Sequence, residues 1–130
     1  MLPLAAEAAL KFKEITYLHA HAMPLGELKH GSLALIDPEC PSVVFLPDDQ
    51  LFSQNKSSVQ EIRSRGGKVL AISSSPIPEA DWNVVLPEGK GVIFAFCATV
   101  AGQLLAYHAA NALGREIDRP RNLAKSVTVK

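Results

Sequence analysis

The sequence carries no excess charge of either sign and few aromatic residues. Its 130 residues include 13 basic and 13 acidic side chains, and aromatic residues make up only 6%. A chain with balanced charge has no overall field with which to attract nucleic acid or an anionic membrane. We therefore expect neither nucleic acid nor a membrane among its partners.

Cysteines and long apolar runs are also scarce. Cys40 and Cys97 stand far apart among apolar or small residues, which favours reduced, buried thiols over a disulfide framework. The apolar run at 92–101 is followed by Gly102, so we expect it to fall short of the ~20 residues of a membrane span. A helical pattern follows Met1 without the basic start or the cleavage site of a signal peptide. These absences predict a cytoplasmic protein.

The apolar content is sufficient for one folded domain. Hydrophobic residues make up 48% of the chain, and a domain of this length buries roughly two-thirds of the surface of its unfolded chain. The pattern predicts helices at 4–18, 49–65 and 92–113 and strands at 43–46, 69–72 and 84–86. Apolar strands that alternate with helices are typical of a parallel sheet covered on both faces, so we predict an α/β fold. Since such a sheet normally opens with a strand and this chain opens with a helix, we expect its first strand to be missing.

Three charged residues of the first predicted helix are spaced to share one face. Glu7, Lys11 and Glu14 follow one another at steps of four and three residues, and side chains at these steps lie one above another on a helix. Such a face can line a cleft and act on a ligand. It can equally be a set of exposed ion pairs that contribute little to stability.

A histidine and a lysine are further candidates for chemistry. His30 lies in a glycine-flanked segment that can turn sharply and present the side chain that titrates closest to neutral pH, although a surface histidine in a turn fits the same pattern. His19 and His21 have no recognised ligand spacing, so no metal site is predicted. Lys125 lies among alternating apolar residues, where a partly desolvated amine can form a Schiff base. An ordinary solvated lysine of a C-terminal tail fits that position as well.

Four segments of the chain, taken in order, resemble one enzyme family. They are LKFKEITY at 10–17, GELKHG at 26–31, QLLAYH at 103–108 and DRPRNLAKSVTV at 118–129. The chain is similar over nearly its whole length to the glucosamine-6-phosphate synthases, the isomerising glutamine:fructose-6-phosphate aminotransferases, and specifically to their second, C-terminal sugar isomerase (SIS) domain. The resemblance implies a three-layer αβα fold with a mostly parallel sheet. We expect an SIS domain at 1–113, truncated at its N-terminus, and a tail at 114–130 that carries the active-site lysine.

The resemblance also implies a role for each candidate residue. Glu14 matches the base that moves a proton between C1 and C2 of the sugar, and Lys11 matches a lysine that assists this movement. His30 matches a histidine tied to opening of the sugar ring, which in this family reaches the active site of a neighbouring subunit. Lys125 matches the lysine that forms a Schiff base with the open-chain ketone and binds the substrate. Glu7 aligns with a family glutamate and is assigned a supporting role in substrate binding.

The chain departs from the family pattern at noncatalytic positions. His21 stands where the family has glutamate, Ser32 where it has proline, and Lys130 where it has glutamate. The glutaminase that supplies ammonia and the first SIS domain that grips the sugar phosphate are absent from the sequence. We therefore expect self-association, or docking on a fuller synthase chain, to complete the sheet and the reaction.

The resemblance predicts conversion of fructose 6-phosphate to glucosamine 6-phosphate through a Schiff base and C1/C2 proton transfer, without a cofactor. Whether the chain is an enzyme on its own stays open. One alternative is a noncatalytic regulatory module that binds sugar phosphates. Another is a related SIS isomerase or deglycase that acts on amino-sugar or fructosamine phosphates.

Overall fold

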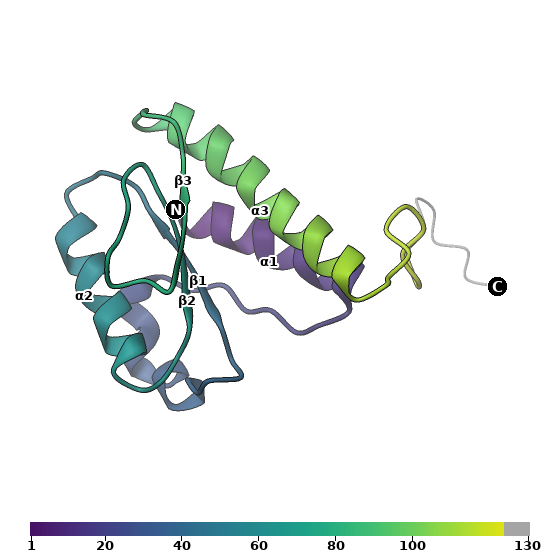
Figure 1. Ribbon diagram of the computed structural model, residues 1–130, viewed down its shortest axis with the longest axis horizontal. Helices are drawn as coiled ribbons and strands as arrows, with labels where there is room; N and C mark the ends of the chain where they lie inside the picture. The colour runs from purple at the N-terminus through teal and green to yellow at the C-terminus, as the bar shows by residue number, and fades with distance from the viewer. Residues whose placement is uncertain (124–130) are drawn as a thin grey trace.

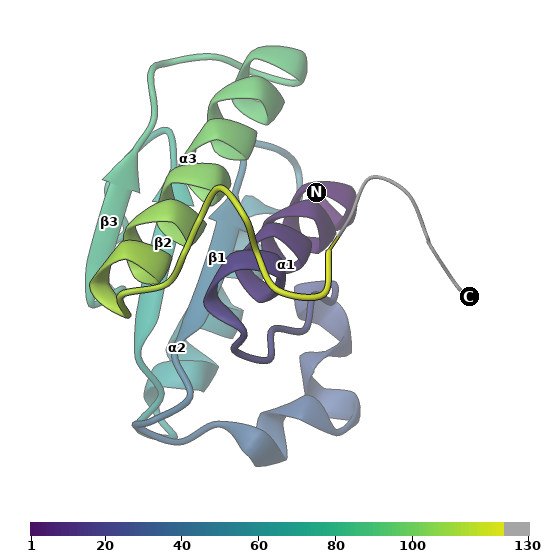
Figure 2. The same cartoon turned by 90° about the vertical axis from the view of Figure 1, so that its right-hand side faces the viewer.

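The computed structural model describes residues 1–123 and shows a three-layer α/β fold. Its sheet contains three parallel strands in the order β1-β2-β3. The strands are β1 (Ser42–Leu46), β2 (Val69–Ser73) and β3 (Trp82–Val85). Helices α1 (Leu2–Thr16) and α3 (Val92–Ala112) cover one face of this sheet (Figures 1 and 2). The other face carries α2 (Phe52–Arg63) and the 3₁₀ helix η1 (Leu25–His30), which a second short helix, η2 (Ser32–Leu35), follows.

Strand residues alternate between two hydrophobic clusters. Val44 and Leu46 of β1 point toward α2 and η1, whereas Phe45 between them points toward α1 and α3. Ala71 and Ile72 divide in the same way on β2. Because side chains of a strand face opposite sides in turn, a strand buried on both sides must be apolar throughout. This explains the uninterrupted apolar runs of β1 and β2, whereas β3 at the edge of the sheet is exposed. The arrangement confirms the predicted α/β class.

The predicted elements are all present, with boundaries shifted by at most three residues. Helix α1 ends at Thr16 because Tyr17 adopts a left-handed conformation, with φ 64°, and its N–H bonds back to the carbonyl of Lys13. Helix α2 begins after a turn in which Asp49 Oδ1 accepts a hydrogen bond from the N–H of Leu51 at 2.9 Å. These caps depend on individual backbone conformations, which a hydrophobic period does not reveal.

Helices α1 and α3 approach each other closely through small side chains. The most buried positions of α3 recur every four residues and include Ala98, Gly102 and Ala106. A Cβ atom added at Gly102 would lie 2.9 Å from Cβ of Ala8 on α1. The helix backbones are therefore in contact at a distance that only glycine permits.

The expectation that Gly102 ends the apolar segment is wrong. The helix is 21 residues long and continues through Gly102 to Ala112, and the glycine lies where α3 contacts α1. By length and composition α3 could cross a membrane, with a mean hydropathy of 1.6. In this fold its small-residue face packs on α1 and the sheet, while most of its remaining surface is exposed.

The expectation that both cysteines are buried is also wrong. Cys40 is exposed in a turn, where its N–H donates to Asp37 Oδ1 at 2.8 Å, and Cys97 is partly exposed on α3. Apolar neighbours in sequence do not show which side of a turn faces solvent.

Asp81 connects the beginning of β2 to α2. Its Oδ2 accepts a hydrogen bond from the N–H of Val69 at 2.8 Å, and Oδ1 pairs with Arg63 and, at 3.5 Å, with Lys68. The Val69 N–H lowers the pKa of the Asp81 carboxyl most, and the charges of Arg63 and Lys68 add to this. The charged form of Asp81 therefore stabilises the fold.

Replacing Gly102 by valine should separate α1 from α3. The added side chain meets Ala8, which belongs to a neighbouring helix and cannot rotate away, so we expect a loss of about 2 kcal/mol in the free energy of unfolding. Urea unfolding measures this loss. Gly26→Ala is the control, because a Cβ at Gly26 meets nothing within 4 Å. Equal stability of the two variants would contradict the close helix contact.

Acid should weaken the fold through Asp81. Since its folded-state pKa is lowered, its contribution is present above the unfolded-state value of ~3.9 and is lost as the pH falls through the folded-state pKa. We expect the urea midpoint of the wild-type chain to fall more steeply than that of Asp81→Asn below about pH 4. Asp48→Asn removes an exposed partner of Lys90 and should keep the wild-type dependence. A wild-type dependence retained in Asp81→Asn would refute this assignment.

Candidate functional site

The predicted charged face of α1 exists and is centred on Lys11. Lys11 Nζ lies 2.8 Å from Glu14 Oε2 and 3.9 Å from Glu7 Oε1. The hydrogen bond to Glu14 raises the pKa of Lys11 most, the charges of Glu14 and Glu7 raise it further, and partial burial opposes them. Lys11 therefore keeps its proton at neutral pH and presents a cation to anything bound beside Glu14.

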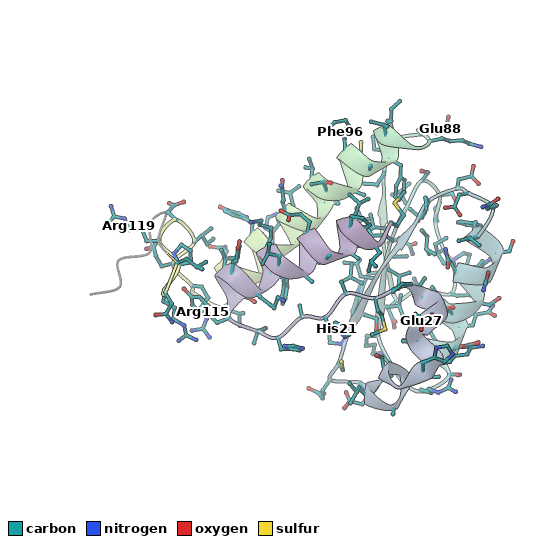
Figure 3. The ribbon with its side chains drawn as sticks, turned by 180° about the vertical axis from the view of Figure 1, so that it is seen from behind. His21, Glu27, Glu88, Phe96, Arg115 and Arg119 are labelled. Carbon is teal, nitrogen blue, oxygen red and sulfur yellow. The ribbon has the colours of Figure 1, made fainter. Side chains whose placement is uncertain are left out.

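The segment after α3 turns back to the C-terminal end of α1. Gly114, with φ 63°, turns the chain, and the following residues approach α1 (Figure 2). The N–H of Arg121 donates to the hydroxyl of Tyr17 at 3.0 Å. Figure 3 shows Arg115 near the ends of the two helices and Arg119 farther out along the segment.

A shallow cleft of about 210 Å³ lies between this segment and α1. Its lining comprises Lys13, Glu14, Tyr17, Arg121, Asn122 and Leu123. The structure thus brings the predicted base, Glu14, together with the segment that leads into the predicted Schiff-base lysine. Lys125 itself follows two positions after Leu123 and lies outside the described residues. The roles of these residues stay predictions.

His30 is not brought to Glu14 within one chain. It ends η1, which buries Leu28 in the cluster between the sheet and α2, whereas α1 packs on the opposite face. The His30 side chain is 71% exposed, and its Nδ1 lies 2.9 Å from Glu27 Oε2. The sheet therefore separates the two predicted catalytic residues.

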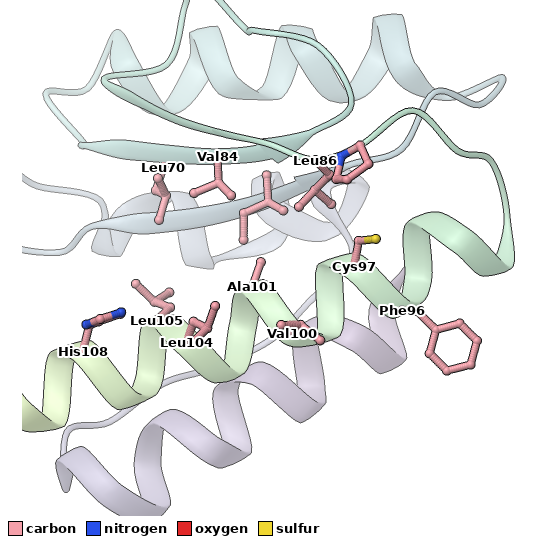
Figure 4. Close-up of a pocket in the computed structure, with 12 residues that line it drawn as sticks. Leu70, Val84, Leu86, Phe96, Cys97, Val100, Ala101, Leu104, Leu105 and His108 are labelled. Carbon is pink, nitrogen blue, oxygen red and sulfur yellow. The ribbon is translucent and has the colours of Figure 1, made fainter.

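A second, larger cleft lies between α3 and the sheet (Figure 4). It has a volume of about 650 Å³ and, apart from Cys97 and His108, an entirely apolar lining. Leu105 and Ala101 point toward the strands, while Phe96 points away from them and is 72% exposed. Sequence reasoning missed this face. The signal in the sequence was that α3 is apolar on all sides. One packed face can bury only part of the surface of such a helix.

Within residues 1–123, no group of three or more histidine, cysteine, aspartate or glutamate side chains could hold a metal ion.

Sequence comparison finds relatives that share one name. Isomerising glutamine–fructose-6-phosphate aminotransferases of Xanthomonas campestris, Xylella fastidiosa and Thermus thermophilus are 52%, 49% and 48% identical to the chain. Each alignment covers 98% of the chain but 22% of the relative. The chain thus spans about a fifth of the length of these relatives.

Solved structures share the fold. The C-terminal domain of glucosamine-fructose-6-phosphate aminotransferase from Francisella tularensis superimposes with a TM-score of 0.79 and 38% identity, over 91% of this chain and 34% of that one. A tagatose-6-phosphate ketose/aldose isomerase from Escherichia coli gives a TM-score of 0.76 and 25% identity, over 85% and 33%. The SIS domain family model matches residues 2–113. The chain therefore belongs to the SIS domain family and is homologous to the C-terminal SIS domain of the isomerising glutamine–fructose-6-phosphate aminotransferases.

Proposed function

We propose that the chain acts as the C-terminal part of the isomerase domain of a glutamine:fructose-6-phosphate aminotransferase and binds fructose 6-phosphate in the cytoplasm. The observation that carries the proposal is Glu14, which pairs with Lys11 and lines a cleft together with the segment that precedes Lys125 in the sequence. The identity of 48–52% with aminotransferases over 98% of the chain supports the same substrate class.

In the proposed reaction the amine of Lys125 attacks the C2 ketone of the open-chain sugar. An imine forms and water leaves. Ammonia, which this chain does not itself generate, then displaces the lysine. Glu14 removes a proton from C1 and a proton is returned to C2, which yields the amino aldose. One carboxylate within reach of both carbons is sufficient for this transfer.

Lys11 supports the transfer through its charge. Its raised pKa keeps the ammonium protonated, so it holds the Glu14 side chain by a hydrogen bond and can donate another to a sugar oxygen. Glu7, at 3.9 Å from the same ammonium, holds it from the other side. Because His30 lies across the sheet from Glu14, we assign it to the site of a neighbouring subunit.

We further propose that a second copy of the chain covers the α3–β3 face. The exposed apolar side chains of this face are Val92 (69%), Phe96 (72%) and Val100 (52%) on α3 and Trp82 (54%) and Val84 (36%) on β3. A contiguous apolar surface of this kind is typical of an interface. Two copies would also supply the second subunit that the assignment of His30 requires.

Borohydride reduction in the presence of fructose 6-phosphate should attach the sugar to Lys125. Mass spectrometry of peptides locates the adduct. We expect no adduct in Lys125→Arg, because a guanidinium does not form the imine, and an unchanged yield in Lys90→Arg, a control at the 80% exposed Lys90. Saturable binding without any adduct would contradict the catalytic proposal and favour a noncatalytic binding module.

Glu14→Gln should separate capture of the sugar from proton transfer. The adduct at Lys125 should still form, while exchange of the C1 hydrogen with deuterated water falls by about 100-fold or more. Proton NMR of the sugar measures this exchange. An exchange rate close to that of the wild type would exclude Glu14 as the base.

The chain should self-associate through α3. Size-exclusion chromatography with light scattering should give a mass above that of one chain, and Phe96→Glu should weaken association by about tenfold or more, since it places a charge in an apolar contact. Leu35→Glu is the control, because Leu35 is 71% exposed on η2, away from this face. A well-folded wild-type monomer would contradict the proposal.

A further inference from the structure

Tyr17 occupies a backbone conformation that a tyrosine adopts at a cost. Its φ of 64° and ψ of 15° place it in the left-handed region at the C-cap of α1. Glycine or asparagine is common at such caps, because a bulky side chain crowds the backbone there. The hydrogen bond from the Tyr17 N–H to the Lys13 carbonyl, 3.1 Å long, needs no side chain. The contacts of the tyrosine side chain must therefore compensate for the strain.

Those contacts are made with the segment that follows α3. The Tyr17 hydroxyl accepts a hydrogen bond from the backbone N–H of Arg121 at 3.0 Å, across 104 positions in the sequence. The guanidinium of Arg121 lies 4.2 Å from the centroid of the Tyr17 ring, and that of Arg115 lies 5.5 Å from it. Both distances are within the range of cation–π attraction. One ring thus holds two cations and one backbone amide of the same segment.

Because the donor is the backbone amide of Arg121, the contact fixes the path of the main chain at this residue. The cation–π contact in addition fixes the Arg121 side chain. Asn122, with φ 62°, turns the chain directly after this contact, and Leu123 lines the cleft beside Glu14. Tyr17 follows Glu14 by three residues and lines the same cleft. Tyr17 therefore holds the segment that precedes Lys125 at the cleft that the candidate base lines.

We propose that Tyr17 is a positioning residue that anchors the segment before Lys125 at the cleft lined by Glu14 and so shortens the tether of the Lys125 amine. The inference rests on the proposed function. Lys125 is four residues after Arg121, and each residue spans at most about 3.6 Å. An anchor at Arg121 therefore limits the volume that the amine can search. Confining a nucleophile near the atom that it attacks raises its rate without a new contact to the substrate.

The test uses variants that keep the helix cap. Tyr17→Gly relieves the left-handed strain, so its urea midpoint should stay at or above that of the wild type, while the ring and hydroxyl are lost. Tyr17→Phe keeps the ring but loses the hydrogen bond to Arg121. Tyr107→Leu removes an exposed tyrosine of α3 and is the matched control.

The first readout is the rate of borohydride trapping at Lys125 against fructose 6-phosphate concentration. We expect Tyr17→Gly to lower the limiting rate about tenfold and to leave the half-saturating concentration within about twofold. Tyr17→Phe should fall between Tyr17→Gly and the wild type, and Tyr107→Leu should match the wild type. An unchanged limiting rate in Tyr17→Gly overturns the proposal, and so does a loss confined to the half-saturating concentration.

The second readout does not depend on catalysis. The ¹⁵N heteronuclear NOE at Leu123 should fall in Tyr17→Gly, and by less in Arg121→Ala, which loses the guanidinium over the ring but keeps the backbone donor. The double variant should show no further fall relative to Tyr17→Gly, because that substitution already removes both contacts. An NOE that stays at the wild-type value overturns the anchor. If the NOE falls as expected but the wild-type chain gives no adduct, the proposed function fails, and the positioning role fails with it. A falling NOE with a normal trapping rate overturns the positioning role alone.

Discussion

The close contact of α1 with α3 at Gly102 is the constraint on which the arrangement of the site depends. Helix α1 carries Lys11 and Glu14, and α3 leads into the segment that returns to Tyr17. The distance between the two helices therefore decides where that segment meets α1. A larger residue at Gly102 would meet Ala8 and move the helices apart. Small side chains inside the fold thus control the position of polar groups at its surface.

The sheet divides the candidate residues into two sets. Glu7, Lys11 and Glu14 lie on the face covered by α1 and α3, whereas His30 lies with η1 on the face covered by α2. Side chains do not cross a sheet, so the two sets of candidate residues face different surroundings within one chain. The proposed second copy offers a way to bring the two sets together.

The sequence was informative where a property is local or periodic. Unbroken apolar strands predicted a parallel sheet buried on both sides, and steps of four and three residues predicted the face shared by Glu7, Lys11 and Glu14, which their distances confirm. The family resemblance predicted the SIS fold, which the comparisons confirm. No period indicates that Arg121 lies on Tyr17, because that contact joins residues 104 positions apart. The exposure of Cys40 depends on one turn, and the exposed face of α3 depends on what packs against it, so neither could be deduced from neighbours in sequence.

The contact between Tyr17 and two arginines has a consequence for how the site responds to acidity. Arginine keeps its charge at every pH at which a protein stays folded, and a backbone amide does not titrate in that range. The contact between Tyr17 and the segment after α3 therefore does not change with pH across the neutral range. The proposed base, Glu14, is not part of this contact, so the groups that hold the segment are separate from the carboxylate assigned to proton transfer.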